Sequence, residues 1–440
     1  MGGVRALLKT VLLATLITSL LAGCGGGSTT SKSTGGATTG TAPANQPDGG
    51  KLVKLTVIGG SGGSENDTLQ QQLIAFMKAN PNIQVAIQQV PWSSTDQLNI
   101  ISNWLNAGSD TPDVLRLDIV WPAQFSQWLL PLDKYFTKDD LSDFLPGPVA
   151  ADTINGHLVA VPAWTDAGLL YYRKDLLAKY GLQPPKTWAE LKQEAKTIGE
   201  KEGIDGFLWQ GAQYEGLVCD FNEWIISNNG AIIKDGKVVV NSPQLVEALK
   251  MAKDLIASGV SPKAVLNYQE EDVRNAFQQG KAVFIRNWPY VWVNAQDPKQ
   301  SKVVGKIGAM PLPAFPGGKS AATLGGWNYS INKYSKHPDE AAKLVAFLTS
   351  ADQQAYAAIH TGHNPTRKSV YEKADVLKAN PFYKDLYSVF INAVGRPQAA
   401  NYGQVSDQIQ IYVHKALTGE LSPEEAMKQL QDQLQQVYKP

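Results

Sequence analysis

Apolar and polar side chains alternate where the folded part of the chain begins. Alternate positions in residues 52–58 are valine or leucine, which predicts a β-strand with one buried face. Leucine, phenylalanine and methionine then recur at helical spacing over residues 69–77. Alternation returns over residues 83–87, and residues 113–117 predict a further strand. Strands that alternate with helices at this spacing predict an α/β fold built from βαβ units.

Later segments carry signals for helix starts. Thr187 and Glu190 form a capping-box pattern, in which each side chain bonds to the backbone of the other residue. Pro243 follows a serine, at the position that proline favours in the first turn. Residues 422–425 predict the start of the last helix, and the apolar side chains that follow form a stripe along it.

The N-terminus has the pattern of an export signal. Arg5 and Lys9 precede an apolar run from residue 11 to residue 21. Leu21-Ala22-Gly23-Cys24 then places small residues before a cysteine, and this order resembles the lipobox of bacterial lipoproteins. We predict a signal peptide over residues 1–23 and lipidation at Cys24. The alternative is an uncleaved membrane helix, but the apolar run is shorter than the ~20 residues that a span requires.

Residues 24–50 are rich in glycine, serine and threonine. Such a segment has too little apolar surface to fold, and we expect it to act as a flexible tether. A lipid at the start of a tether would hold the folded body close to a membrane without spanning it.

Composition narrows the function of the body, residues 51–440. The formal net charge of the chain is zero, so neither nucleic acid nor an acidic polymer is an expected partner. The chain has two cysteines, Cys24 and Cys219, and no zinc-binding HExxH motif, so we expect no metal site and no cofactor. The glycine-rich loop at residues 59–64 lacks the lysine of a phosphate-binding loop. The 11 tryptophans and 16 tyrosines are numerous; most must be core residues, but several are candidates for a carbohydrate site.

Seven stretches of the body resemble the family 1 extracellular solute-binding proteins of bacterial ABC sugar importers, and look most like the trehalose/maltose-binding branch. They are TPDVLRLDIVWPAQF (111–125), WLLPLDKYF (128–136), AVPAWTDAGLLYYRKDLL (160–177), LWQGAQYEGLVCDFNEWI (208–225), FQQGKAVFIRNWPYVW (277–292), GKIGAMPLPAFPGG (305–318) and GGWNYSINKYS (325–335). Each stretch is moderately specific alone, and their joint order is strongly specific.

The resemblance implies a two-lobed periplasmic-binding-protein fold in which each lobe is a sheet flanked by helices. The chain would cross between the lobes three times, near residues 162–165, 305–308 and 331–334. The expected N-lobe comprises residues 51–163 and 306–332, and the expected C-lobe comprises residues 164–305 and 333–440. Ligand would lie in the cleft between the lobes.

A neutral sugar needs hydrogen-bonding partners for its hydroxyl groups and flat rings for its apolar C–H faces. Glu65 directly follows the glycine-rich loop, and Asp118 directly follows a predicted strand, so both are candidate acceptors for hydroxyl groups. The alternatives are a helix N-terminal carboxylate for Glu65 and a helix cap for Asp118. Trp164 and Asp166 pair an aromatic ring with a carboxylate at the first expected crossing.

The family resemblance implies further ligand contacts. It assigns stacking platforms to Trp288 and Tyr290, and another to Gly326-Trp327. It also assigns sugar contact to Arg396, for which a surface salt bridge is the plain alternative. Trp209, Tyr214 and Glu215 are weaker candidates, and Arg367 is expected to be structural.

The sequence departs from the family at one place. Some relatives have an arginine after the second strand, where this chain reads Ser93-Ser94-Thr95-Asp96-Gln97. Gln97 can donate a hydrogen bond but lacks the charged fork of a guanidinium. The identity of the disaccharide therefore stays open.

The expected function is that of an extracytoplasmic, lipid-anchored, monomeric binding protein. It would capture a sugar, with an α-linked glucose disaccharide such as trehalose or maltose favoured, and deliver it to the permease subunits of an ABC importer. Two alternatives stay open: a secreted glycosidase that uses the same carboxylates, and a sugar-sensing surface lipoprotein.

Overall fold

The computed structural model describes residues 51–60 and 63–439. The predicted signal peptide, the tether and Cys24 lie outside the described residues. Within the described part of the chain, every helix is too short or too polar to cross a lipid bilayer.

A six-stranded mixed sheet forms one half of the body. Its strand order is β14-β6-β13-β3-β1-β2, with β1 parallel to β2 and β3, and β13 antiparallel to β3 and β6. The strands are β1 (Val53–Gly59), β2 (Ile83–Gln89), β3 (Val114–Asp118), β6 (Val161–Ala167), β13 (Leu324–Ile331) and β14 (Asn364–Pro365). The predicted βαβ unit is confirmed, because helix α1 (Gly63–Ala79) connects β1 to β2. Leu69, Leu73 and Phe76 on its predicted apolar face are buried.

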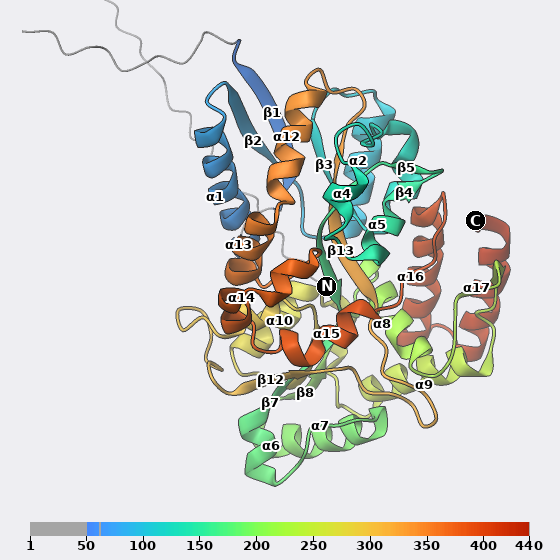
Figure 1. Ribbon diagram of the computed structural model, residues 1–440. Helices are drawn as coiled ribbons and strands as arrows, with labels where there is room; N and C mark the ends of the chain where they lie inside the picture. Colours follow the sequence, from blue (N-terminus) through green and yellow to red (C-terminus); the bar gives the residue numbers. More distant parts are fainter. Residues whose placement is uncertain (1–50, 61–62, 440) are drawn as a thin grey trace, which may run out of the picture. The chain divides into compact units, whose positions relative to one another are not determined.

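A four-stranded sheet forms the other half, below the first in Figure 1. Its order is β12-β7-β11-β8, with β8 parallel to β11, and β7 antiparallel to both of its neighbours. The strands are β7 (Leu169–Arg173), β8 (Asp205–Leu208), β11 (Ala282–Asn287) and β12 (Ile307–Met310). The α/β fold class is confirmed. We call the half with the six-stranded sheet the N-lobe and the other half the C-lobe.

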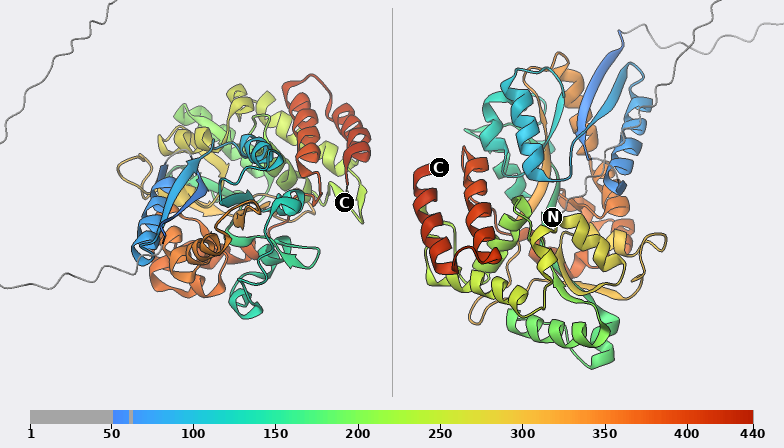
Figure 2. Two further views of the ribbon diagram at one scale, coloured as in Figure 1. Left: turned by 90° about the horizontal axis from the view of Figure 1, so that it is seen from above. Right: turned by 180° about the vertical axis from the view of Figure 1, so that it is seen from behind.

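Helices pack around each sheet. The longer N-lobe helices are α1, α2 (Ser94–Asn106), α12 (Pro338–Leu348) and α13 (Ala351–Thr361). The main C-lobe helices are α6 (Lys174–Tyr180), α7 (Trp188–Glu202), α8 (Glu215–Ile226), α9 (Pro243–Ala257), α10 (Glu270–Gln278), α16 (Tyr402–Thr418) and α17 (Pro423–Val437). The last two pack side by side and against α9, as both views in Figure 2 show.

Further elements complete the two lobes. The remaining helices are α3 (Pro122–Phe125), α4 (Lys138–Leu141), α5 (Pro146–Ala151), α11 (Val291–Ala295), α14 (Ala374–Ala379) and α15 (Tyr383–Ile391), with 3-10 turns at Ser126–Trp128, Lys263–Asn267 and Lys368–Glu372. Two small hairpins pair β4 (Thr153–Ile154) with β5 (His157–Leu158), and β9 (Ile233–Lys234) with β10 (Lys237–Val238).

The predicted helix starts are confirmed. Thr187 and Glu190 form a reciprocal capping box, and Ser422 and Glu425 form another. Pro243 occupies the first turn of α9. These local signals act within one turn, so sequence alone locates them well.

The first connection between the sheets is a single residue, Gly168, which separates β6 from β7. A Cβ atom at Gly168 would lie 1.9 Å from a carboxylate oxygen of Glu223, so only glycine fits. The second connection is residues 311–323, between β12 and β13. The third is residues 392–401, which run beside the second, where Val394 accepts a hydrogen bond from Leu324 and donates one to Ala322.

Strand pairing and helix packing differ from the predicted lobe division at three points. β6 pairs with β13 as far as Ala167, beyond the expected crossing at 162–165. β12 pairs with β7 in the C-lobe sheet, although residues 306–332 were assigned to the N-lobe. Helices α12 and α13 pack on α1, although residues 333–440 were assigned to the C-lobe. We therefore propose that the crossings lie at residues 168, 311–323 and 392–401. The predicted positions differ because sheet membership depends on long-range strand pairing, which a local motif does not reveal.

Candidate functional site

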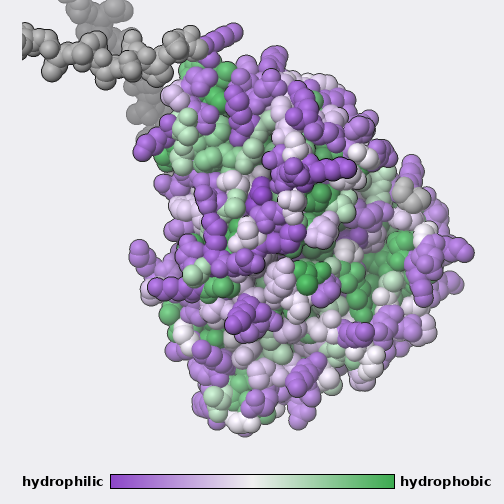
Figure 3. Space-filling view, viewed as in Figure 1, coloured by the Kyte–Doolittle hydropathy of each residue, from purple (hydrophilic) through white to green (hydrophobic). Residues whose placement is uncertain are grey.

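A cavity of about 280 Å³ is lined by side chains from both lobes. All nine residues predicted to bind ligand line it: Glu65, Asp118, Trp164, Asp166, Trp288, Tyr290, Gly326, Trp327 and Arg396. Figure 3 shows apolar side chains gathered across the middle of one face of an otherwise largely hydrophilic surface. The cavity volume is just below the ~300–1,000 Å³ that ligand pockets usually have.

Sheet register brings the N-lobe part of the site together. Trp327 on β13 lies opposite Asp118 at the end of β3 and opposite Trp164 on β6. Gly325 lies opposite Asp166, two residues further along β6. Side chains that are more than 150 residues apart in sequence therefore meet at one edge of the cavity.

Gly326 has a backbone conformation that only glycine adopts readily. Its φ angle is +129°, and a Cβ atom would lie 2.5 Å from the carbonyl oxygen of Trp164. The missing side chain lets β13 approach β6 closely. This close approach positions the ring of Trp327 beside the cavity.

The aromatic rings of the N-lobe are supported by neighbouring side chains. The ring of Trp164 stacks on the imidazole of His363, with centroids 4.2 Å apart and planes 8° apart. The guanidinium of Arg116 lies 4.6 Å from the ring centroid of Trp327. Burial lowers the pKa of His363 to about 4, so the imidazole is neutral at pH 7. A neutral imidazole and a cation packed against the rings hold both indoles in place.

The C-lobe contributes a second aromatic pair. The guanidinium of Arg286, buried on β11, lies 4.0 Å from the ring centroid of Trp288. Arg286 also forms ion pairs with Glu223 at 2.5 Å and Asp220 at 2.8 Å, both on α8. The hydroxyl of Tyr290 donates to a carboxylate of the α10 first turn, Glu271, at 2.8 Å. Trp288 and Tyr290 are thus fixed on a charged network.

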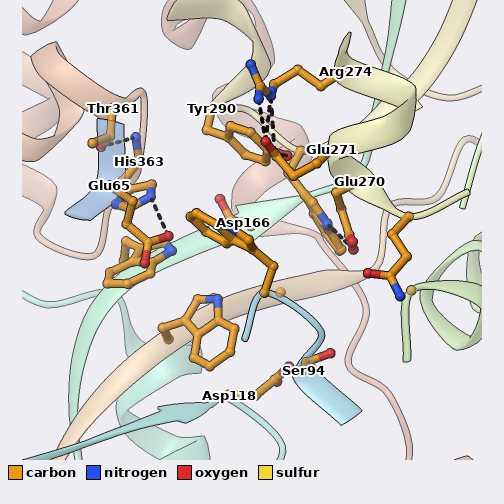
Figure 4. A pocket seen from close by; sticks show the side chains of 18 of the residues that line it. Glu65, Ser94, Asp118, Asp166, Glu270, Glu271, Arg274, Tyr290, Thr361 and His363 are labelled. Atoms are coloured by element: carbon orange, nitrogen blue, oxygen red, sulfur yellow. Dashed lines mark hydrogen bonds and ion pairs between the residues drawn. The ribbon is translucent and has the colours of Figure 1, made fainter. Parts of the chain in front are cut away.

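Carboxylates of the site differ in how their oxygens are satisfied. Glu65, in the first turn of α1, pairs with Arg116 and lies 3.9 Å from His363 (Figure 4). Asp118 accepts two hydrogen bonds from Arg396, at 2.6 and 3.2 Å. Arg396 therefore lines the cavity as predicted, but most of its guanidinium is engaged by carboxylates, which a local motif does not indicate.

Asp166 lies near the centre of the cavity in Figure 4. Its Oδ1 atom is buried and has no hydrogen-bonding partner among the described residues. Burial, together with the nearby carboxylates of Glu65 and Asp118, raises the pKa of Asp166 to about 7. A buried polar oxygen of this kind is a ready acceptor or, when protonated, a donor for a ligand hydroxyl.

Several lining residues were missed by sequence reasoning: Trp92, Ser94, Arg116, Glu270, Glu271, Arg274 and His363. Glu270 and Glu271 look in sequence like ordinary acidic residues at a helix start. Arg116 and His363 reach the cavity only because β3 and the segment before β14 lie next to it. An arginine inside a buried strand was the one available signal.

Only some of the weaker candidates lie at or next to the cavity. Glu215 lines the cavity, and Tyr214 donates a hydrogen bond to Glu270 at 2.6 Å. Trp209 does not line the cavity: it lies in the C-lobe core with its indole N–H bonded to Ser261. Arg367, which is expected to be structural, donates a hydrogen bond to the backbone carbonyl of Thr349.

Gln97 does not replace the absent arginine. Its amide nitrogen donates to the backbone carbonyls of Pro91 and Trp92, and its oxygen accepts from Arg116. The side chain is buried in this local network. Ser94 and Gln97 are the residues of this stretch that line the cavity.

Two α/β lobes, joined by three connections and enclosing a cavity lined by indole rings and carboxylates, define the class of two-lobed periplasmic binding proteins. Residues 62–355 match the family described as bacterial extracellular solute-binding protein, and the chain belongs to this family.

Relatives and solved structures agree with the family. A probable ABC transporter-binding protein of Deinococcus radiodurans is 43% identical over 396 residues, which cover 88% of this chain and 94% of the relative. The structure of maltose-bound MalE3 of T. maritima has a TM-score of 0.85 at 49% identity, covering 88% of this chain and 100% of that one. The GacH receptor of Streptomyces glaucescens, solved without ligand and with acarbose, has a TM-score of 0.79 at 30% identity, covering 88% of this chain and 100% of that one.

Proposed function

We propose that this protein captures a sugar outside the cytoplasm and delivers it to the permease of an ABC importer. The observation that carries the proposal is a cavity in which indole rings and carboxylates from both lobes surround one space. The rings suit the apolar C–H faces of a pyranose, and the carboxylates suit its hydroxyl groups. No cofactor takes part in the proposed function.

We further propose an α-linked glucose disaccharide, such as maltose or trehalose, as the ligand. The MalE3 structure at 49% identity contains maltose, which supports this choice. Lobe closure would bring the platforms of Trp164 and Trp327 against one side of the sugar and that of Trp288 against another. Because ligand contacts both lobes only when they are closed, sugar would favour the closed form, which the permease would then bind.

Lipid anchoring at Cys24 and a monomeric state complete the proposal. The tether of residues 24–50 would keep the body close to the permease and raise its local concentration. Mass spectrometry of the membrane-extracted protein should find a diacylated N-terminal cysteine, and Cys24→Ser should release the protein into the medium or periplasm. An unmodified, soluble wild-type chain would refute the anchor, and light scattering checks the monomer.

Thermal unfolding with a panel of sugars tests the proposal. A ligand at 100 times its Kd should stabilise the protein by about 2.7 kcal/mol. Trp288→Ala should raise the Kd roughly 30-fold, because it removes a central aromatic contact worth about 2 kcal/mol. The matched control is Trp128→Ala, which removes an indole outside the cavity and should leave the Kd unchanged.

Chromatography of the same mixtures distinguishes binding from the glycosidase alternative. We expect the disaccharide to be recovered intact after prolonged incubation. Hydrolysis to glucose would refute a binding role. Absence of stabilisation by every mono-, di- and oligosaccharide tested would refute a sugar ligand.

A further inference from the structure

Arg396 lies on the third connection between the lobes and bonds to a carboxylate of each lobe. Its Nη2 atom donates to Asp118 Oδ1 at 2.6 Å, at the end of N-lobe strand β3. Its Nη1 atom donates to Glu215 Oε1 at 2.7 Å, in the first turn of C-lobe helix α8. Arg396, Asp118 and Glu215 are 3%, 6% and 5% exposed, so the whole cluster is shielded from water.

Glu215 is held firmly by its own lobe. The hydroxyls of Tyr402 and Ser406, both on α16, donate hydrogen bonds to its carboxylate. The backbone N–H of Glu215 also donates to Thr95 Oγ1 at 3.1 Å. With Arg396, four groups therefore form hydrogen bonds with this residue. Thr95 belongs to α2 of the N-lobe, so α8 touches the other lobe at this residue.

Lobe opening would disturb this cluster. Asp118 belongs to the N-lobe sheet and Glu215 to α8, so lobes that separate as rigid bodies would pull at least one carboxylate away from the guanidinium. Breaking a buried ion pair leaves a charge without its partner, which is strongly unfavourable. All three side chains of the cluster belong to this chain, so the cluster can favour the closed arrangement without sugar.

We propose that Glu215 is a positioning residue for ligand capture: it holds Arg396 against Asp118 and raises the fraction of ligand-free protein that is closed. This inference rests on the proposed function for its effect on affinity, but not for its effect on closure. If sugar binds tightly only to the closed form, the measured Kd equals the intrinsic Kd divided by the closed fraction. Loss of Glu215 should then lower the closed fraction and raise the measured Kd by the same factor.

Single-molecule energy transfer between the lobes measures the closed fraction. Dyes are placed through Lys78→Cys on α1 and Lys201→Cys on α7, two exposed positions, with both native cysteines replaced by serine. Glu215→Gln keeps the shape of the side chain and removes its charge. We expect the closed fraction without ligand to fall about fivefold or more, and the Kd for maltose to rise by the same factor.

The matched control is Glu190→Gln, which neutralises a first-turn carboxylate of another C-lobe helix and should change neither quantity. Tyr402→Phe removes one hydrogen bond to Glu215. It should change the closed fraction and the Kd in the same directions as Glu215→Gln but by smaller factors, and it replaces Glu215→Gln as the test if that variant does not fold.

A lower melting temperature with an unchanged closed fraction would overturn the inference, because it would show a structural role only. A lower closed fraction with an unchanged Kd would overturn the link to capture. If the wild type binds no sugar, the proposed function fails, while the ligand-free distances still test whether Glu215 favours closure.

Discussion

Asp166→Asn should make the ligand-free protein more stable at alkaline pH. The carboxylate of Asp166 is buried with one oxygen unpartnered among the described residues, and its neighbours Glu65 and Asp118 are also acidic. Asparagine resembles the protonated acid and carries no charge. The substitution therefore removes the cost of ionising this group inside the cavity.

The direction follows from proton binding in the two states. The folded protein holds the proton of Asp166 up to a pKa of about 7, whereas the unfolded chain releases it near the ordinary value of 3.8. Between these values the folded state binds more protons than the unfolded state, so the contribution of Asp166 to stability falls as pH rises. The contribution is fully present below pH 3.8 and is lost by about pH 7.

The size of the effect follows from the two pKa values. A difference between about 7 and 3.8 corresponds to about 4 kcal/mol when the group is fully ionised. Unfolding a body of about 390 residues changes the entropy by roughly 0.8 kcal/mol/K, so the substitution should raise the melting temperature by about 5 °C at pH 8. At pH 4 the two proteins should melt within about 1 °C of each other.

Differential scanning fluorimetry of both proteins from pH 4 to pH 8 checks this prediction. The difference between the two melting curves isolates Asp166, because every other titrating group is shared. The same substitution should weaken sugar binding, since it removes a carboxylate that faces the cavity. Melting temperatures that stay parallel across the whole range would refute the assignment of a raised pKa to Asp166.

Two further substitutions test how the site is built. Gly326→Ala forces a Cβ atom to within 2.5 Å of the Trp164 carbonyl and should destabilise the protein by at least about 1–3 kcal/mol, measured as a lower melting temperature; an unchanged melting temperature would contradict the close approach. Glu223→Ala removes a buried partner of Arg286 and should lower the free energy of unfolding by about 3–5 kcal/mol, measured by chemical denaturation. It should also quench or shift the fluorescence of Trp288. A decrease below about 1 kcal/mol would show that Asp220 alone satisfies the arginine.

Local patterns in the sequence located the elements of this fold. Alternation of apolar residues located β1 and β2, residues 113–117 were predicted as the strand that is β3, and helical spacing located α1. The capping boxes at Thr187 and Ser422 gave helix starts that the structure confirms. Such signals involve neighbours in the chain, whose contacts do not depend on the rest of the molecule.

The candidate site was predictable to the extent that its residues lie in recognisable stretches. Every residue predicted to bind ligand lines the one cavity described above, although Arg396 is largely engaged by carboxylates. The supporting groups were not predictable: the imidazole behind Trp164 comes from His363, about 200 positions further along the chain. Nothing near His363 in the sequence indicates an aromatic partner.

Sequence by itself thus determined the elements, the α/β class and the residue types of a carbohydrate site. Tertiary structure decided which sheet β12 joins, which lobe α12 and α13 cover, and which charges neutralise one another. The physical reason is that pairing between distant strands, and the burial that shifts the pKa of Asp166, arise only when segments remote in sequence share one water-poor space.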